Sequence, residues 1–200
     1  MGYFFMLKPQ CIIKLAKELF DGNKRIVYNI SAEFICNLAS TYIVKLMQYV
    51  HIIIGNDQSQ HCDNVADMSQ RHEFLSLAKL YNIEGKPKDL LKLLGEKIIS
   101  QYNNHSLKLI MTCGSDPVFY AEFDDCEPVK FEKIEITKIN PENIVDTNGA
   151  GDAFVGGFLS VYIKNENDYK RGIITGNKAA HYIIQQSGFT IQHDCTPPFM

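Results

Sequence analysis

Residues 146–157 contain the side chains and the spacing best suited to chemistry. Gly149 and Gly151 bracket Ala150 and lead directly into an apolar segment with helical spacing. The first amides of a helix have no partner inside it, and the helix dipole places about half a positive charge at that end. Small residues let a ligand approach the backbone closely. The turn is therefore a candidate cradle for a phosphate or a developing oxyanion.

Asp152 follows this turn directly. The helix dipole keeps its carboxylate ionised, so it can accept a proton from a hydroxyl whose attack on phosphorus the amides stabilise. Two common phosphate loops do not match: Phe154 stands where GxGxxG needs glycine, and Gly157 and Phe158 stand where a Walker A loop needs Lys-Ser/Thr. On chemistry alone, a tight turn with a capping aspartate remains the alternative.

Hydrophobic periodicity predicts an α/β domain around this turn. Apolar runs indicate strands at residues 3–7, 25–30, 51–54 and 107–113. Helical spacing indicates helices at residues 9–22, 40–47 (capped by Ser40), 89–102, 153–163 and 169–186. Alternating strands and helices imply right-handed crossovers and a parallel sheet. Residues 118–123 and 129–136 alternate like antiparallel neighbours, so the sheet becomes mixed. We expect one domain over residues 1–200.

Composition excludes several classes of partner. The 20 Lys and Arg against 23 Asp and Glu give a net charge of −3 without long blocks of one sign, so no nucleic-acid or membrane surface is expected. Residues 1–10 lack the pattern of a secretion signal, so none is expected, and no apolar run reaches membrane-spanning length. Its six cysteines lack a CxxC pair, which is typical of buried thiols in a reducing compartment. We expect a cytoplasmic protein, with the nucleus as a second location, that binds small molecules.

One cluster of residues and one further histidine are not interpreted as functional. His61, Cys62, Asp63 and His72 fit no transition-metal pattern and are interpreted as surface residues. His181 is interpreted as a partly buried helix residue.

The stretch from Asp146 to Leu159, DTNGAGDAFVGGFL, closely resembles the signature of the ribokinase-like (PfkB) carbohydrate and nucleoside kinases. Its Asn148 is similar to the form found in the adenosine kinases of that family. Further segments resemble these kinases in order and spacing: residues 2–5 with Pro9, 29–35, 49–56, 112–114 and 177–180. The resemblance implies a three-layer α/β/α fold with a mostly parallel sheet, from which the N-terminal part and the lid are missing.

The resemblance also implies a reaction: transfer of the ATP γ-phosphate to the 5′-hydroxyl of adenosine with Mg²⁺, giving AMP and ADP for purine salvage. Asp152 matches the catalytic base of the family. The residues that match its anion hole are Asn148, Gly149, Ala150 and Gly151. A complete protein of this kind is expected to be a monomer.

Other positions are assigned by the same resemblance. Thr112 and Gly114 resemble a turn near the ATP ribose and phosphates, and the segment from Asn177 to Gly188 resembles the wall of the adenine pocket. Phe34 falls at an aromatic position that lies against the nucleoside. From the residue alone, Phe34 could instead be a core side chain.

Two departures from the family bear on activity. The family organises its metal with Asn-x-x-Glu; Asn56 is present and would act through water, but Ser59 stands where the glutamate is expected. A hydroxyl carries no charge to order Mg²⁺ waters, and Asp57 is an alternative only from a shifted register. The chain also begins at what resembles the middle of the fold. A sugar kinase and a non-catalytic fragment with an ATP-side surface therefore remain alternative functions.

Overall fold

A computed structural model describes residues 2–57, 72–102, 106–124 and 127–188. The chain divides into two compact units, one of residues 1–114 and 118–133 and the other of residues 115–117 and 134–200. Each unit is described by itself. The expectation of a single domain concerns how the units assemble, and it stays a prediction.

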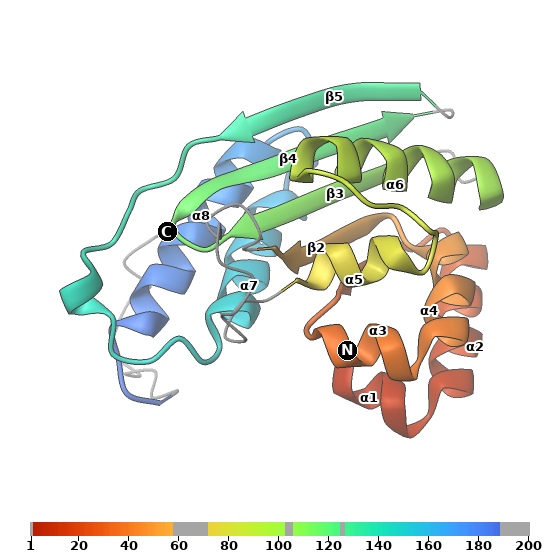
Figure 1. The fold of residues 1–200 in the computed structure, drawn as a ribbon, viewed down its shortest axis with the longest axis horizontal. Helices are drawn as coiled ribbons and strands as arrows, with labels where there is room; N and C mark the ends of the chain where they lie inside the picture. Colours follow the sequence, from red (N-terminus) through yellow and green to blue (C-terminus); the bar gives the residue numbers. More distant parts are fainter. Residues whose placement is uncertain (1, 58–71, 103–105, 125–126, 189–200) are drawn as a thin grey trace. The chain divides into compact units, whose positions relative to one another are not determined.

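The first unit is built on a five-stranded sheet in the order β1-β2-β3-β4-β5 (Figure 1). Its strands are β1 (Val27–Asn29), β2 (Ile52–Asn56), β3 (Ser106–Cys113), β4 (Asp116–Asp124) and β5 (Glu127–Ile134). The first three strands are parallel, with Ile52 beside both Val27 and Lys108. Figure 1 shows β3, β4 and β5 running in alternating directions. The α/β class and the mixed sheet are as the sequence predicted.

The helices of the first unit pack on this sheet and on one another. They are α1 (Gly2–Leu7), α2 (Pro9–Asp21), α3 (Glu33–Leu38), α4 (Ser40–Leu46), the 3-10 helix η1 (Met47–Tyr49), α5 (Glu73–Lys79) and α6 (Pro87–Tyr102). α5 packs against β2 and α6 against β3. The core between helices and sheet includes the fully buried Ile53, Leu109 and Phe123. Phe123 fills the space opposite Gly95 of α6 so closely that a Cβ there would overlap its ring.

Two predictions about the N-terminal part are wrong. Residues 3–7 form part of helix α1 instead of a strand. A short apolar run does not distinguish a strand from a buried helix, and here Phe5 is fully buried in the core. Ser40 does not cap α4: the capping position is Ala39, which directly follows α3, and Ser40 is the first helical residue. Helix α3 itself was not foreseen.

The second unit consists of the 3-10 helix η3 (Pro141–Asn143), α7 (Ala150–Tyr162) and α8 (Tyr169–Ile184). α7 and α8 pack along each other, and glycines allow their backbones to approach. The ring of Phe158 lies against Gly172 and stacks on Tyr162 at a centroid distance of 5.1 Å. Both helices are as predicted, except that α7 begins three residues earlier, inside the glycine turn.

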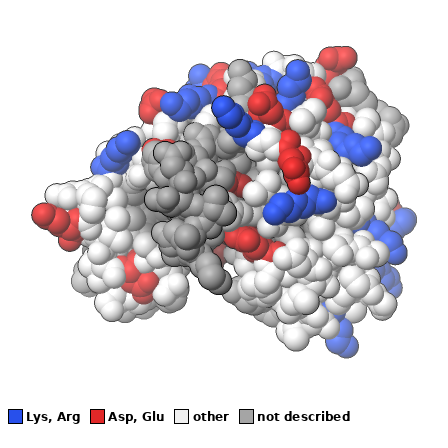
Figure 2. Space-filling view, viewed as in Figure 1, with Lys and Arg blue, Asp and Glu red and all other residues white. Residues whose placement is uncertain are grey.

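The described surface mixes both signs of charge. Figure 2 shows Lys and Arg interspersed with Asp and Glu on the visible face. No helix within the described ranges has both the length and the apolar character required to cross a bilayer.

Candidate active site

The glycine turn forms the N-terminal end of α7. Gly149 is the capping residue with φ +78°, a left-handed conformation that glycine adopts without strain. The amide of Ala150 donates to the Thr147 carbonyl at 3.3 Å. The next two amides, of Gly151 and Asp152, donate to no described residue. Two unpaired donors therefore remain at the positive end of a 13-residue helix.

The surface beside Gly151 is open. An added Cβ on Gly151 would meet nothing within 4 Å. The side chain of Asp152, in the first turn of α7, is exposed. One helix end thus carries a carboxylate and two unpaired amides, an arrangement that can accept a proton and hold an anion. The roles of these residues, and of the exposed Asn148, stay predictions.

The segment before the turn is held by α8. The amides of Val145 and Asp146 both donate to the Ile184 carbonyl, at 2.8 and 3.1 Å, at the end of α8. The Asp146 Oδ1 accepts from the Asn148 amide at 2.9 Å. The last turn of α8 therefore fixes the chain immediately before the glycines, and no sequence signal pointed to this contact.

The residues assigned to the adenine pocket also lie in the second unit. Asn177 is buried in α8, and its Nδ2 lies 3.3 Å from Nε2 of His181. Burial lowers the pKa of His181, which keeps the ring neutral and able to accept this bond. Gly188, with φ +78°, is exposed. His181 is half-buried on the helix, as the sequence predicted.

In the first unit, several candidate residues meet at the carboxyl ends of the parallel strands. Asn56 at the end of β2 is paired in register with Thr112 of β3, whose Oγ1 donates to the Gly55 carbonyl at 3.2 Å. Gly114 follows β3 with φ +62°. Open α/β sheets bind ligands at this edge. Phe34 follows β1 and is 43% exposed, so its interpretation as a core side chain is wrong.

Asp57, the alternative metal residue, has a structural task. It is 2% exposed, and its Oδ2 accepts from the Leu75 amide at 3.1 Å, capping α5. Its Oδ1 lies 3.6 Å from Nδ1 of His72. The neighbouring Glu73, 4% exposed, accepts from the Asn56 amide at 2.9 Å. The sequence reasoning missed this bracing between β2 and α5, because a cap supplied from another element leaves no local pattern.

The described residues do not by themselves form a magnesium site. The buried Oδ1 of Asn56 has no hydrogen-bond partner, which leaves one neutral oxygen available. Mg²⁺ is usually bound through one or two carboxylates and substrate phosphates. The part of the chain that the structure describes contains no group of three or more His, Cys, Asp or Glu arranged to hold a metal. Ser59, His61, Cys62 and Asp63 lie outside the described residues.

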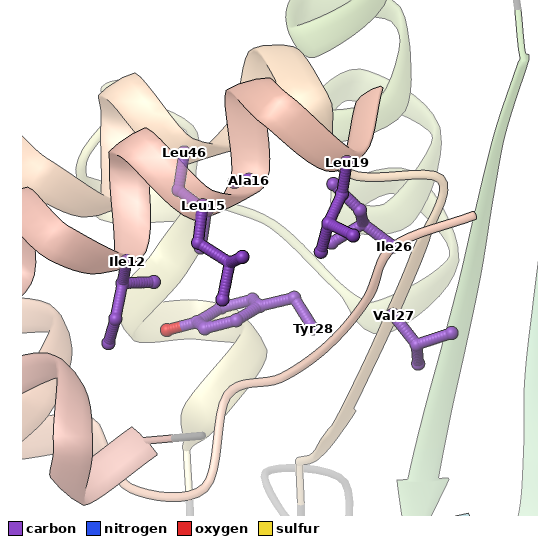
Figure 3. A pocket seen from close by; sticks show the side chains of 8 residues that line it. All are labelled: Ile12, Leu15, Ala16, Leu19, Ile26, Val27, Tyr28 and Leu46. Atoms are coloured by element: carbon purple, nitrogen blue, oxygen red, sulfur yellow. The ribbon is translucent and has the colours of Figure 1, made fainter. Parts of the chain in front are cut away.

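A hollow between α2 and β1 is a different feature (Figure 3). Its cavity volume is about 20 Å³, room for about one water. The residues lining it are Ile12, Leu15, Ala16, Leu19, Ile26, Val27, Tyr28 and Leu46. The buried Tyr28 hydroxyl has no hydrogen-bond partner, and Figure 3 shows its ring beneath Leu15. Burial raises the pKa of Tyr28 far above its ordinary value. The cavity is too small to be a nucleoside site.

The mixed sheet and the helices packed on it define an α/β protein, and the glycine turn gives it a helix end suited to holding an anion. The model of the pfkB family carbohydrate kinases matches residues 8–194. The chain therefore belongs to the pfkB family of carbohydrate kinases.

Its relatives include adenosine kinases. The chain is 28% identical to adenosine kinase 2 of Arabidopsis thaliana over 189 residues, which cover 94% of this chain and 49% of the relative. It is 26% identical to the adenosine kinase of Dictyostelium discoideum, covering 96% of this chain and 50% of the relative. The chain thus spans about half the length of the curated relatives that it matches.

Solved structures agree on the fold. The adenosine kinase of Anopheles gambiae, in complex with P1,P4-di(adenosine-5) tetraphosphate, aligns with a TM-score of 0.73 and 30% identity over 94% of this chain and 50% of that chain. The adenosine kinase of Schistosoma mansoni with 2-fluoroadenosine aligns with a TM-score of 0.72 over 92% of this chain and 48% of that chain. At 23% identity, the second alignment shows the fold alone.

Proposed function

We propose that the chain takes part in transfer of the ATP γ-phosphoryl group to the 5′-hydroxyl of adenosine. The observation that carries the proposal is the exposed Asp152 carboxylate beside the unpaired amides of Gly151 and Asp152. Transfer of a phosphoryl group to an alcohol needs a proton acceptor for the nucleophile and donors for the charge on the transferred oxygens. One helix end supplies both.

The 5′-oxygen bonds to the γ-phosphorus while Asp152 accepts its proton, and the bond from the γ-phosphorus to the bridging oxygen breaks, releasing ADP. The amides of the glycine turn hold the oxygens of the migrating group. Asn148, Gly149 and Ala150 shape that turn. Mg²⁺ would accompany the ATP phosphates and neutralise their charge.

Adenosine as the acceptor is supported by the names of several relatives and by one side chain. Phe34, in the helix that follows β1, exposes 43% of its surface, and a purine base can stack on such an aromatic ring. On the ATP side we propose Thr112 and Gly114 near the ribose and phosphates, and Asn177 with Gly188 at the adenine. Ribose and fructose, offered as acceptors beside adenosine, distinguish this proposal from a sugar kinase.

Nucleotide binding without catalysis is the second candidate. Ser59 stands where the family has the glutamate that organises its metal. The carboxylate of the nearby Asp57, the alternative metal residue, is engaged in capping α5, and this observation favours binding without catalysis. In that case ATP would raise the melting temperature by mass action while no AMP forms.

Asp152→Asn tests the proposal directly. We expect turnover with ATP and adenosine to fall by about two to four orders of magnitude, the usual contribution of a general base. Asp168→Asn is the matched control, because that carboxylate also lies at the start of a helix in the same unit. AMP formation is followed by chromatography, together with each variant's melting temperature. Full turnover in Asp152→Asn would remove this mechanism.

A further inference from the structure

The backbone between β1 and α3 turns through an unusual conformation at Ser31. Its φ is +69°, in the left-handed region that side chains disfavour. The amide of Ala32 donates to the Ile30 carbonyl at 2.9 Å, so Ser31 is the central residue of a γ-turn of the rare, strained kind. The other described non-glycine residues with positive φ are Asn23 and Asn82, a residue type that tolerates it.

Side-chain contacts hold this turn on both sides. The Ser31 hydroxyl donates to the Asn29 carbonyl at 3.2 Å, closing the turn onto the end of β1. Two residues on, Glu33 Oε1 accepts from the His72 amide at 2.7 Å, which ties the first turn of α3 to the start of α5. With six residues, α3 is too short to be stable alone. These anchors therefore set its direction.

The residue that follows these anchors is Phe34. Ile35 and Cys36 next to it are fully buried, while Phe34 is 43% exposed. The helix is thus fixed to the core by its inner face and presents one aromatic ring on its outer face. Strained backbone persists where the surroundings over-determine it, and it clusters at ligand sites.

We propose that Ser31 is a positioning residue that, braced by Glu33, orients the Phe34 ring for stacking on the planar base of the acceptor. The inference rests on the proposed function, because it assigns the ring to the nucleoside. An acceptor without a base, such as ribose, gains nothing from this orientation. Ser31 then contributes to the choice of a nucleoside over a free sugar without touching the base itself.

The test is calorimetric titration of the chain with adenosine and with ribose. In Ser31→Gly the backbone is no longer restricted, and we expect the adenosine Kd to rise about fivefold, equivalent to about 1 kcal/mol, with the ribose Kd unchanged. Asn23→Gly is the matched control, since it removes the side chain from a residue of similar φ in another turn. That variant should keep the wild-type adenosine Kd.

A double-mutant cycle separates positioning from a general effect on folding. If Ser31 acts through the ring, Ser31→Gly has no further effect on the adenosine Kd in a Phe34→Ala background. Additive effects, or a fall in melting temperature with an unchanged adenosine Kd, would overturn the inference. A wild-type chain that binds no adenosine contradicts the proposed function itself. Wild-type binding with an unaltered Kd in Ser31→Gly contradicts only the positioning role.

Discussion

Gly157 of α7 and Gly176 of α8 bring two helix backbones into direct contact. A Cβ on Gly157 would lie 2.8 Å from the Gly176 Cα and 2.8 Å from the Thr175 carbonyl oxygen, closer than side-chain carbons approach backbone. Neither neighbour is a flexible side chain that could move aside. The separation of the two helices is therefore set by the absence of side chains at these positions.

Gly157→Ala should force α7 and α8 apart. We expect it to lower the free energy of unfolding by about 1–3 kcal/mol, the usual effect of an inserted methyl group in a tightly packed site. The adjacent Gly156→Ala is the control: a Cβ there meets nothing within 4 Å, so helix propensity should raise stability by up to about 1 kcal/mol. Urea unfolding of both variants measures the difference. Equal stabilities would contradict this packing.

Asp57→Ala should destabilise the first unit. Removing the carboxylate leaves the partly buried Leu75 amide at the start of α5 without its acceptor, which we expect to lower the free energy of unfolding by about 1–3 kcal/mol. Asp57→Asn retains an oxygen acceptor and should lose less. Thermal and urea unfolding measure both variants. Unchanged stability combined with weakened magnesium binding would instead identify Asp57 as a metal ligand.

Lowering the pH should reduce the stability of the second unit through protonation of His181. Burial lowers the pKa of His181 below its ordinary value of 6.5, and Nε2 accepts from Asn177. His181 therefore binds a proton more readily in the unfolded chain than in the folded one. The stability that the neutral His181 contributes is present above about pH 6.5 and is lost as the pH falls toward the pKa of His181 in the folded chain.

His181→Gln keeps an acceptor for Asn177 but cannot be protonated in this range. The free energy of unfolding is measured from about pH 7.5 to about pH 5, on both sides of the ordinary histidine pKa of about 6.5. We expect it to depend less on pH in this variant than in the wild type. An identical pH dependence in the two proteins would show that His181 does not contribute.

Sequence reasoning identified those elements whose signals are local. Helix α2 begins at Pro9 and ends before Gly22, and periodic apolar residues mark it along its length. The strands at Ile52–Asn56 and Ser106–Cys113 contain apolar runs, and the glycine turn lies at the start of α7, as its residue types indicate. These patterns were enough for the α/β class, and the resemblance of residues 146–159 to the family signature indicated the family.

What the sequence could not show depends on contacts between distant segments. The run at residues 3–7 is a helix because of what Phe5 packs against. The cap of α5 comes from Asp57, 16 residues before the first residue of that helix. The γ-turn at Ser31 has no local signature, because serine is not a residue type that indicates positive φ. Each of these features could be predicted only from the position of the neighbouring element.

The two hydrogen bonds to the Ile184 carbonyl couple the glycine turn to a helix end remote from it in sequence. An anion that immobilises residues 149–152 would also immobilise the last turn of α8, without touching it. Amide hydrogen exchange at residues 182–184 would then slow when nucleotide binds. The C-terminal end of α8 would serve as a built-in reporter of occupancy at the turn.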